Sequence, residues 1–163
     1  MYQLEVKAAL VARQFPRSAG WSVTVDIDAM ERAKGGVHAA GKQERVAVSE
    51  REIRESGATI GAHPRFGRAD IVAEHATLGT VIVEVEGESS RQREQAVYSA
   101  LGQALLNMRV FDGSISYAIA VPHQEDWVRQ LRKVPGAVAR RLNLRLLAVS
   151  ASGVEEVVSE IEP

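Results

Sequence analysis

Three acidic residues lie in or beside two apolar segments of this chain, where an unpaired carboxylate is unfavourable. Asp70 precedes Ile71-Val72, and Glu84 and Glu86 alternate with valines in the segment 81–86. Successive side chains of a strand point to opposite faces, so Glu84 and Glu86 are predicted to project from the same side. A buried carboxylate needs a compensating charge, and a divalent cation is the simplest candidate.

The two segments are predicted to form a hairpin, with strands over residues 69–75 and 80–87 and a turn over 76–79. This pairing places Glu84 across from Asp70 or its immediate neighbour. Two carboxylates at that separation repel each other unless a cation bridges them or one holds a proton. Because Mg²⁺ commonly uses one or two protein carboxylates and keeps several waters, these acids and a backbone carbonyl suffice for Mg²⁺ or Mn²⁺.

The rest of the chain supplies the elements that must position these acids. Residues 31–66 show little pattern beyond a short helical turn capped by Ser49. The order helix, three strands, helix, strand, helix, strand predicts an α/β fold, with a mixed central sheet flanked by helices in one domain over residues 1–163. Apolar periodicity predicts helices over 2–15, 91–109 and 125–141 (interrupted near Pro135-Gly136), and further strands over 21–30, 114–121 and 144–149.

Composition narrows the function classes. The 163 residues are 45% hydrophobic and 25% charged, with net charge −1, so a nucleic-acid surface must be a local patch. The absence of cysteine excludes disulfides and thiolate metal sites and is compatible with a cytoplasmic location. We expect no membrane span, since no stretch of 18 apolar residues occurs, and no signal peptide. The sequence contains neither a phosphate-binding loop nor a dinucleotide-binding motif, so we expect no nucleotide cofactor.

Asp70 followed by Glu84-Val85-Glu86 resembles the signature of the PD-(D/E)XK nuclease superfamily, whose restriction-endonuclease-like core has the order αβββαβ. The segment 100–106, with Gln103 in Ala-Leu-Gly-Gln, is similar to the helix after the catalytic strand in many members. The resemblance covers roughly residues 67–121. It implies a DNA nuclease in which Asp70, Glu84 and the Val85 carbonyl bind Mg²⁺ or Mn²⁺.

The resemblance also implies single-step hydrolysis by metal-activated water, with Gln103 orienting substrate or water. Glu5 is a weaker match to an additional helical acid of some members. Two positions depart from the family pattern: Ala69 replaces a proline, and Glu86 replaces the lysine that offers positive charge to the attacked phosphate. Some members use glutamate there as a general base or second-metal ligand.

Three hypotheses follow. The chain is an active metal-dependent nuclease with Glu86 in that role, or an inactive member of the same fold. The inactive member would serve as a nucleic-acid-binding or protein-assembly module, for instance a homodimer. In the third hypothesis the acids form only the surface edge of an unrelated α/β domain, with their side chains splayed apart.

Basic residues after the second hairpin strand and on the later helix are candidates for phosphate contacts. The ordinary interpretation of such residues is a solvated helix face. DNA is the expected partner, in a homodimer or a larger nucleoprotein complex. The candidate nucleic-acid-binding residues are Arg91, Arg93, Arg129, Arg132 and Lys133.

Overall fold

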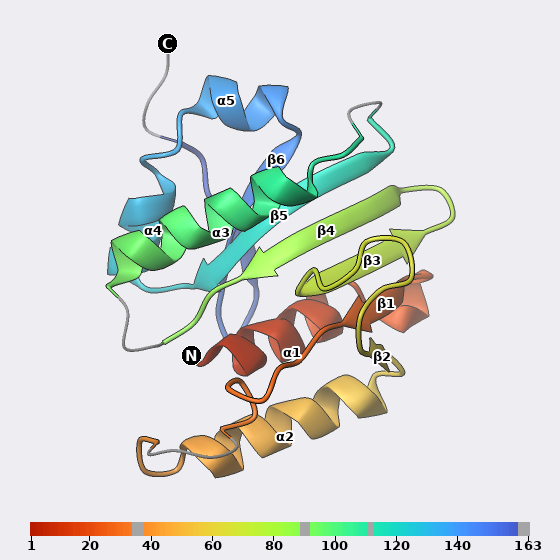
Figure 1. Cartoon of the computed structure of the whole chain (residues 1–163), viewed down its shortest axis with the longest axis vertical. Helices are drawn as coiled ribbons and strands as arrows, with labels where there is room; N and C mark the ends of the chain where they lie inside the picture. Colours follow the sequence, from red (N-terminus) through yellow and green to blue (C-terminus); the bar gives the residue numbers. More distant parts are fainter. Residues whose placement is uncertain (34–37, 89–91, 111–112, 160–163) are drawn as a thin grey trace.

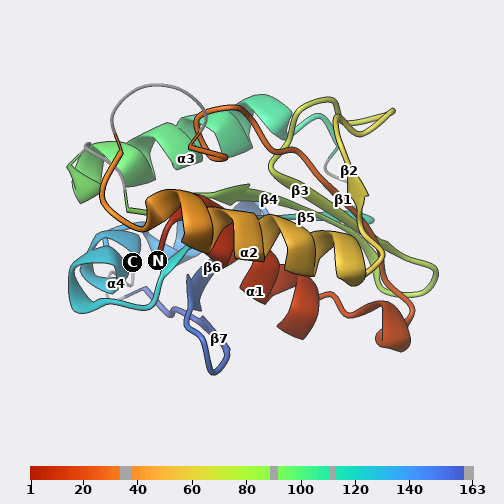
Figure 2. The same ribbon diagram turned by 90° about the horizontal axis from the view of Figure 1, so that it is seen from below.

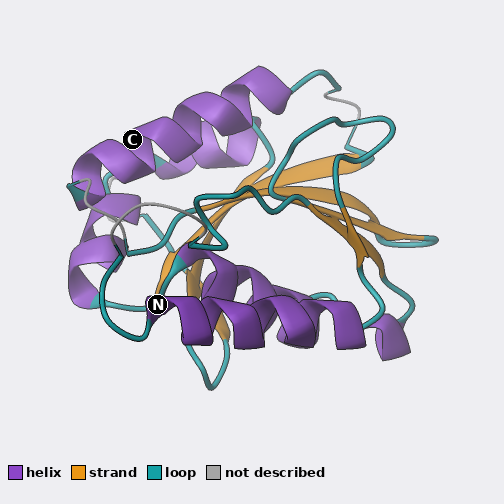
Figure 3. Ribbon diagram, turned by 60° about the horizontal axis from the view of Figure 1, so that its bottom comes forward, coloured by secondary structure: helices purple, strands orange, loops and turns teal. Residues whose placement is uncertain are grey.

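A mixed seven-stranded sheet forms the centre of the molecule, with helices against both faces (Figures 1 and 3). The computed structural model describes residues 1–33, 38–88, 92–110 and 113–159. This architecture confirms the predicted α/β class. In chain order the elements are α1 (Gln3–Arg13), the short 3₁₀ helix η1 (Arg17–Ala19), β1 (Ser22–Val25), α2 (Lys42–Glu55), β2 (Thr59–Ile60), β3 (Ile71–His75), β4 (Gly79–Val85), α3 (Arg93–Asn107), β5 (Ile115–Pro122), α4 (Glu125–Leu131), α5 (Gly136–Arg141), β6 (Leu144–Val149) and β7 (Val154–Glu156).

The strand order β2-β1-β3-β4-β5-β6-β7 places the predicted hairpin β3–β4 in the interior of the sheet. Strands β4, β5 and β6 are parallel, and β3 is antiparallel to both β1 and β4. Parallel neighbours need crossover connections, and α3 and the α4–α5 pair supply them. The end of β4 and the beginning of β3 therefore meet at one edge of the sheet.

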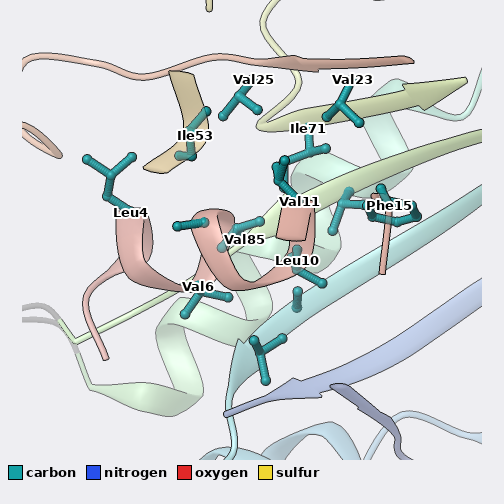
Figure 4. Packing of buried hydrophobic residues seen from close by; sticks show 14 of the residues in the cluster. Leu4, Val6, Leu10, Val11, Phe15, Val23, Val25, Ile53, Ile71 and Val85 are labelled. Carbon is teal, nitrogen blue, oxygen red and sulfur yellow. The ribbon is translucent and has the colours of Figure 1, made fainter. Parts of the chain in front are cut away.

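Two hydrophobic clusters cover the two faces of the sheet. Helices α1 and α2 pack on one face, and α3 lies on the other (Figure 2). Figure 4 shows the first cluster, which contains Leu10 of α1, Phe15 just after that helix and Ile53 of α2. Val83 and Val85 belong to this cluster, whereas Ile82 belongs to the α3 side. By alternation, Glu84 faces α3.

Most predicted elements agree with the observed ones to within a residue or two at each end, where helices and strands commonly fray. The interruption near Pro135 separates α4 from α5 as predicted. The two-residue β2 and three-residue β7 were not predicted, because segments this short carry no periodicity.

The strand predicted over residues 21–30 ends at Val25. Beyond it the chain turns, and the Asp28 carboxylate accepts the backbone N–H of Glu31 at 2.8 Å. The alternating pattern continues through Asp26 and Ile27, but this side-chain bond to the backbone offers the chain a turn in place of a strand.

Residues 42–55 form a full helix where only a capped turn was predicted. Its buried positions are only Val46, Ser49 and Ile53, so the apolar stripe is too sparse to read from sequence. Ser49 was predicted wrongly as the N-cap: it lies within the helix, and its hydroxyl donates to the Arg45 carbonyl at 3.2 Å.

Gly87 fixes the end of β4 against the first turn of α1. A Cβ atom at Gly87 would collide with the backbone of Tyr2 and Gln3, so only glycine permits this approach. Beside this contact, the Glu88 N–H donates to the Met1 carbonyl at 2.9 Å. The approach brings α1 to the same sheet edge as the end of β4. Among the described residues, no helix has the length and apolar character needed to cross a bilayer.

Candidate functional site

Asp70 and Glu84 lie opposite each other at the edge where β3 begins and β4 ends. The paired residues of β3 and β4 run from His75–Gly79 to Ile71–Val83, so the same register continues to Asp70 and Glu84. The Val85 N–H donates to Asp70 Oδ2 at 2.8 Å, which holds the Asp70 carboxylate over the end of β4. The prediction that these two acids lie across from each other is confirmed.

Lys7 of α1 is the cation of this site. Its side chain is 1% exposed, and its Nζ lies 2.7 Å from Asp70 Oδ1 and 2.6 Å from Glu31 Oε1. Nζ also donates to the Asp26 carbonyl at 2.6 Å, so all three ammonium protons have partners. One turn earlier on α1, Gln3 Nε2 lies 3.4 Å from both carboxylate oxygens of Asp70.

Glu31 closes the site from the turn that follows β1. Its Oε1 binds Lys7, and its Oε2 accepts the Asp28 N–H at 3.3 Å. Glu31 is 9% exposed and Glu84 is 4% exposed, so both acids are largely shielded from water. We call the four side chains Lys7, Glu31, Asp70 and Glu84 the buried charge cluster.

The buried charge cluster holds more negative than positive charge, with three carboxylates around one ammonium. Burial raises the pKa of Glu84 to about 8, and the negative charge of Asp70 adds to this effect. Burial likewise raises the pKa of Glu31 to about 7, although Lys7 opposes the shift. Burial alone would lower the pKa of Lys7, but Asp70 and Glu31 outweigh it and raise that pKa. At neutral pH the site therefore keeps an ammonium ion and retains a proton, chiefly on Glu84.

Asn107, at the end of α3, is the amide that contacts the cluster. Its Nδ2 donates to Glu84 Oε1 at 2.7 Å. Gln103 lies one turn earlier on the same helix, and its side chain is exposed. The α3 amide that donates to Glu84 Oε1 is therefore that of Asn107. A role for Gln103 in orienting substrate or water remains a prediction.

Glu86 lies just past the last residue of β4 and is half-buried. Its backbone N–H donates to the Ala120 carbonyl at 2.9 Å, which extends the pairing with β5. Its role as a base or second-metal ligand stays a prediction, as does the Val85 carbonyl as a metal ligand. Glu5 turns away from the cluster, because both its carboxylate oxygens bind Arg45 of α2 at 2.8 Å.

The third hypothesis expected carboxylates splayed apart at the surface, and Asp70 and Glu84 do not have that arrangement, whereas an unrelated α/β domain stays an open hypothesis. Glu84 is buried and lies in register with Asp70, whose side chain is 16% exposed.

The donor chemistry of Asp70 and Glu84 suits a hard divalent cation. Within the part of the chain that the structure describes, no group of three or more acidic or histidine side chains is arranged to hold a metal ion. Two carboxylates are nonetheless sufficient for Mg²⁺, which keeps much of its water. Asp70 and Glu84 bring two carboxyl groups to one strand end beside a single ammonium, so the residues present fit a two-carboxylate cation site.

No known family model matches this chain, and no curated protein matches it. The site is therefore interpreted from its own geometry and from the motif in the sequence.

The predicted nucleic-acid residues form a second group of charges, on α3 and α4. Arg93 lies 3.5 Å and Arg129 lies 2.8 Å from carboxylate oxygens of Asp126. Lys133 lies 3.3 Å from Glu94 Oε1. We call Arg93, Glu94, Asp126, Arg129 and Lys133 the surface charge cluster.

The surface charge cluster lies far from the carboxylates. Arg93 begins α3 and Asn107 ends it, and 15 residues of helix span about 22 Å. Arg129 and Arg132 line a cavity of about 460 Å³ beside the beginning of α4. Arg91 lies outside the described residues. Arg129 and Arg132 therefore lie close to each other, but neither they nor Arg93 lie beside Asp70.

Sequence reasoning missed Lys7, Glu31 and Asn107. Lys7 had a detectable signal, because it falls between the core residues Leu4 and Ala8 on the apolar side of a helix. A lysine at such a position predicts a buried acidic partner. Glu31 and Asn107 carried no comparable signal, since one lies in a turn and the other at a helix end.

Proposed function

We propose that this protein is a metal-dependent nuclease-like domain that hydrolyses DNA phosphodiester bonds. The observation that carries the proposal is the pairing of Asp70 and Glu84 at one strand end beside a buried ammonium. Carboxyl groups whose pKa values are shifted by burial and by a charged neighbour are common at functional sites. We place the protein in the cytoplasm as part of the same proposal.

Asp70 and Glu84 would hold Mg²⁺ or Mn²⁺, with the Val85 carbonyl as a third oxygen ligand. The bound ion would polarise the phosphate and lower the pKa of a water molecule. Glu84 must release its proton to bind a cation, so binding is expected to become tighter as pH rises through its pKa of about 8.

Lys7 acts as a positioning residue for Asp70. Its Nζ–Oδ1 contact of 2.7 Å and the Val85 N–H together fix both oxygens of the carboxylate. Lys7 also places one buried positive charge beside Asp70. Glu86, half-buried at the same strand end, would act as the general base or second-metal ligand.

The test is DNA cleavage by the purified protein with Mg²⁺ or Mn²⁺. Glu84→Ala and Asp70→Asn are expected to abolish cleavage, while Glu94→Gln, on the exposed face of α3, leaves it unchanged. Cleavage that persists at the wild-type rate in Glu84→Ala and Asp70→Asn would overturn the proposal.

Metal binding gives a readout that does not depend on catalysis. Mn²⁺ is expected to raise the melting temperature of the wild-type protein, and Glu84→Ala should remove the gain. Calorimetry in two buffers of different ionisation enthalpy should detect a proton released on binding near pH 7. If Mn²⁺ does not change the melting temperature of the wild-type protein, Asp70 and Glu84 do not form a cation site.

A second candidate function is an inactive nuclease-like module that binds nucleic acid or another protein. The observation that favours it is that both oxygens of Asp70 already have protein donors, Lys7 and the Val85 N–H. On this hypothesis the protein neither binds Mn²⁺ nor cleaves DNA, but it still retards DNA in a gel or self-associates.

A further inference from the structure

Helix α3 carries a concentrated patch of exposed apolar side chains. Of the eight large hydrophobic residues exposed in the described chain, three lie on this one helix. They are Tyr98 at 57%, Leu105 at 51% and Leu106 at 81% exposure. The others are spread singly over separate segments. Scattered apolar residues are ordinary, but a grouped set on one face indicates an interaction site.

Gly102 lies in the same helix and has no packing role within the described chain. A Cβ atom added there meets none of the described atoms within 4 Å. Glycine inside a helix costs about 0.5–1 kcal/mol relative to alanine. The small residue leaves room for another backbone to approach the helix closely.

The α3 face is complementary to itself in the antiparallel direction. Tyr98 and Leu105 are centred beside Gly102, and along the sequence so are Glu94, in the first turn, and Arg109, which follows the non-helical Met108. In an antiparallel pair, Tyr98 of each copy meets Leu105 of the other, and Glu94 comes near the segment that carries Arg109. A two-fold interface requires this reciprocity. Opposed helix dipoles add to it.

We infer that a second copy of this chain docks on α3, forming a two-fold antiparallel pair of helices that cross near Gly102. Glu94 Oε1 already accepts from Tyr98 at 2.7 Å and from Lys133 at 3.3 Å, so the acid is held at the border of the face. One helix face is smaller than the roughly 800 Å² per partner of a standard interface, so the dimer is weak and depends on concentration.

Sedimentation velocity over a concentration series provides the first test. The weight-average mass is expected to rise from 17.7 kDa towards twice that value as the concentration increases. Leu105→Glu should hold the protein monomeric, whereas Leu78→Glu, equally exposed but in the β3–β4 turn, should not. A wild-type chain that stays monomeric would assign this face to a different partner and overturn the inference.

Cysteine cross-linking tests the geometry directly, because the chain contains no cysteine of its own. Gly102→Cys lies beside the two-fold axis and should form a disulfide-linked dimer rapidly under mild oxidation. Leu78→Cys should cross-link only at the slow collisional rate. Equal rates for the two variants, with circular dichroism showing both folded, would refute the antiparallel pairing.

Charge exchange tests the register. Glu94→Arg and Arg109→Glu should each weaken the dimer, and the double variant should restore it. Weakening that persists undiminished in the double variant would contradict contact between these two residues.

Discussion

Ion pairs in the buried charge cluster and in the surface charge cluster have similar lengths, but the two clusters differ in burial and in their balance of charge. Lys7 lies 2.7 Å from Asp70, and Arg129 lies 2.8 Å from Asp126. The first cation is 1% exposed and the second is 62% exposed. In water, ion pairs gain little because solvent screens them. In the interior, each charge depends on its partner. Distance alone therefore does not identify a functional charge.

The largest difference in stability between the two clusters is expected when Lys7 is replaced, in the variant Lys7→Met. Removing the ammonium leaves Glu31 and Asp70 without their cation, which should cost about 3–5 kcal/mol of unfolding free energy near pH 7. Urea denaturation measures the loss. The matched control, Lys133→Met, removes an exposed ammonium and should have a far smaller effect. Equal losses in the two variants would show that the buried cluster has no special dependence on its lysine.

The second prediction concerns pH, measured in chelator to exclude metal. The Glu84 pKa of about 8 in the folded protein lies above its ordinary value of 4.5. The stability it contributes is complete below pH 4.5 and is lost as pH rises towards 8, because only the unfolded chain releases the proton in this window. Glu84→Gln should reduce that decline by a few kcal/mol.

In the Glu84→Gln variant, the free energy of unfolding should still fall as pH rises to about 7, but by less than in the wild type. This smaller fall comes from Glu31, whose pKa is also raised. Glu94→Gln, in the surface charge cluster, should leave the wild-type slope intact. Urea unfolding at a series of pH values gives both slopes, and an unchanged slope in Glu84→Gln would place the retained proton elsewhere.

The third prediction separates Asn107 from Gln103. Asn107→Ala removes the 2.7 Å hydrogen bond to Glu84 and should cost about 1–3 kcal/mol. Gln103→Ala changes an exposed side chain one turn away and should alter stability by less than about 0.5 kcal/mol. Thermal and urea unfolding compare the two, and the reverse ranking would mean that Gln103 supports the site.

The smallest effect is expected in the surface charge cluster. Arg129→Gln breaks the contact with Asp126 and should cost at most about 1 kcal/mol, a loss that added salt reduces further. Weaker retardation of DNA by this variant, at unchanged stability, would assign Arg129 to phosphate contacts. Full retardation would leave it a solvated ion pair.

The sequence by itself determined the local geometry of the site. The alternation of Val83, Glu84 and Val85 fixed which face each side chain occupies, and the short turn set the pairing of Glu84 with Asp70. Both properties follow from strand period and hairpin register over neighbouring residues. The order of the longer elements followed from periodicity in the same way, except for α2, β2 and β7.

Only the tertiary structure decided which residues surround the carboxyl groups of Asp70 and Glu84. Lys7 comes from α1, Glu31 from the turn after β1 and Asn107 from the end of α3, and no local pattern links them to Asp70 or Glu84. Their contacts depend on how two helices pack on opposite faces of the sheet, with Gly87 allowing α1 to approach the end of β4. Burial then sets the charge state of the site, because the cost of an unpaired charge depends on the solvent it has lost.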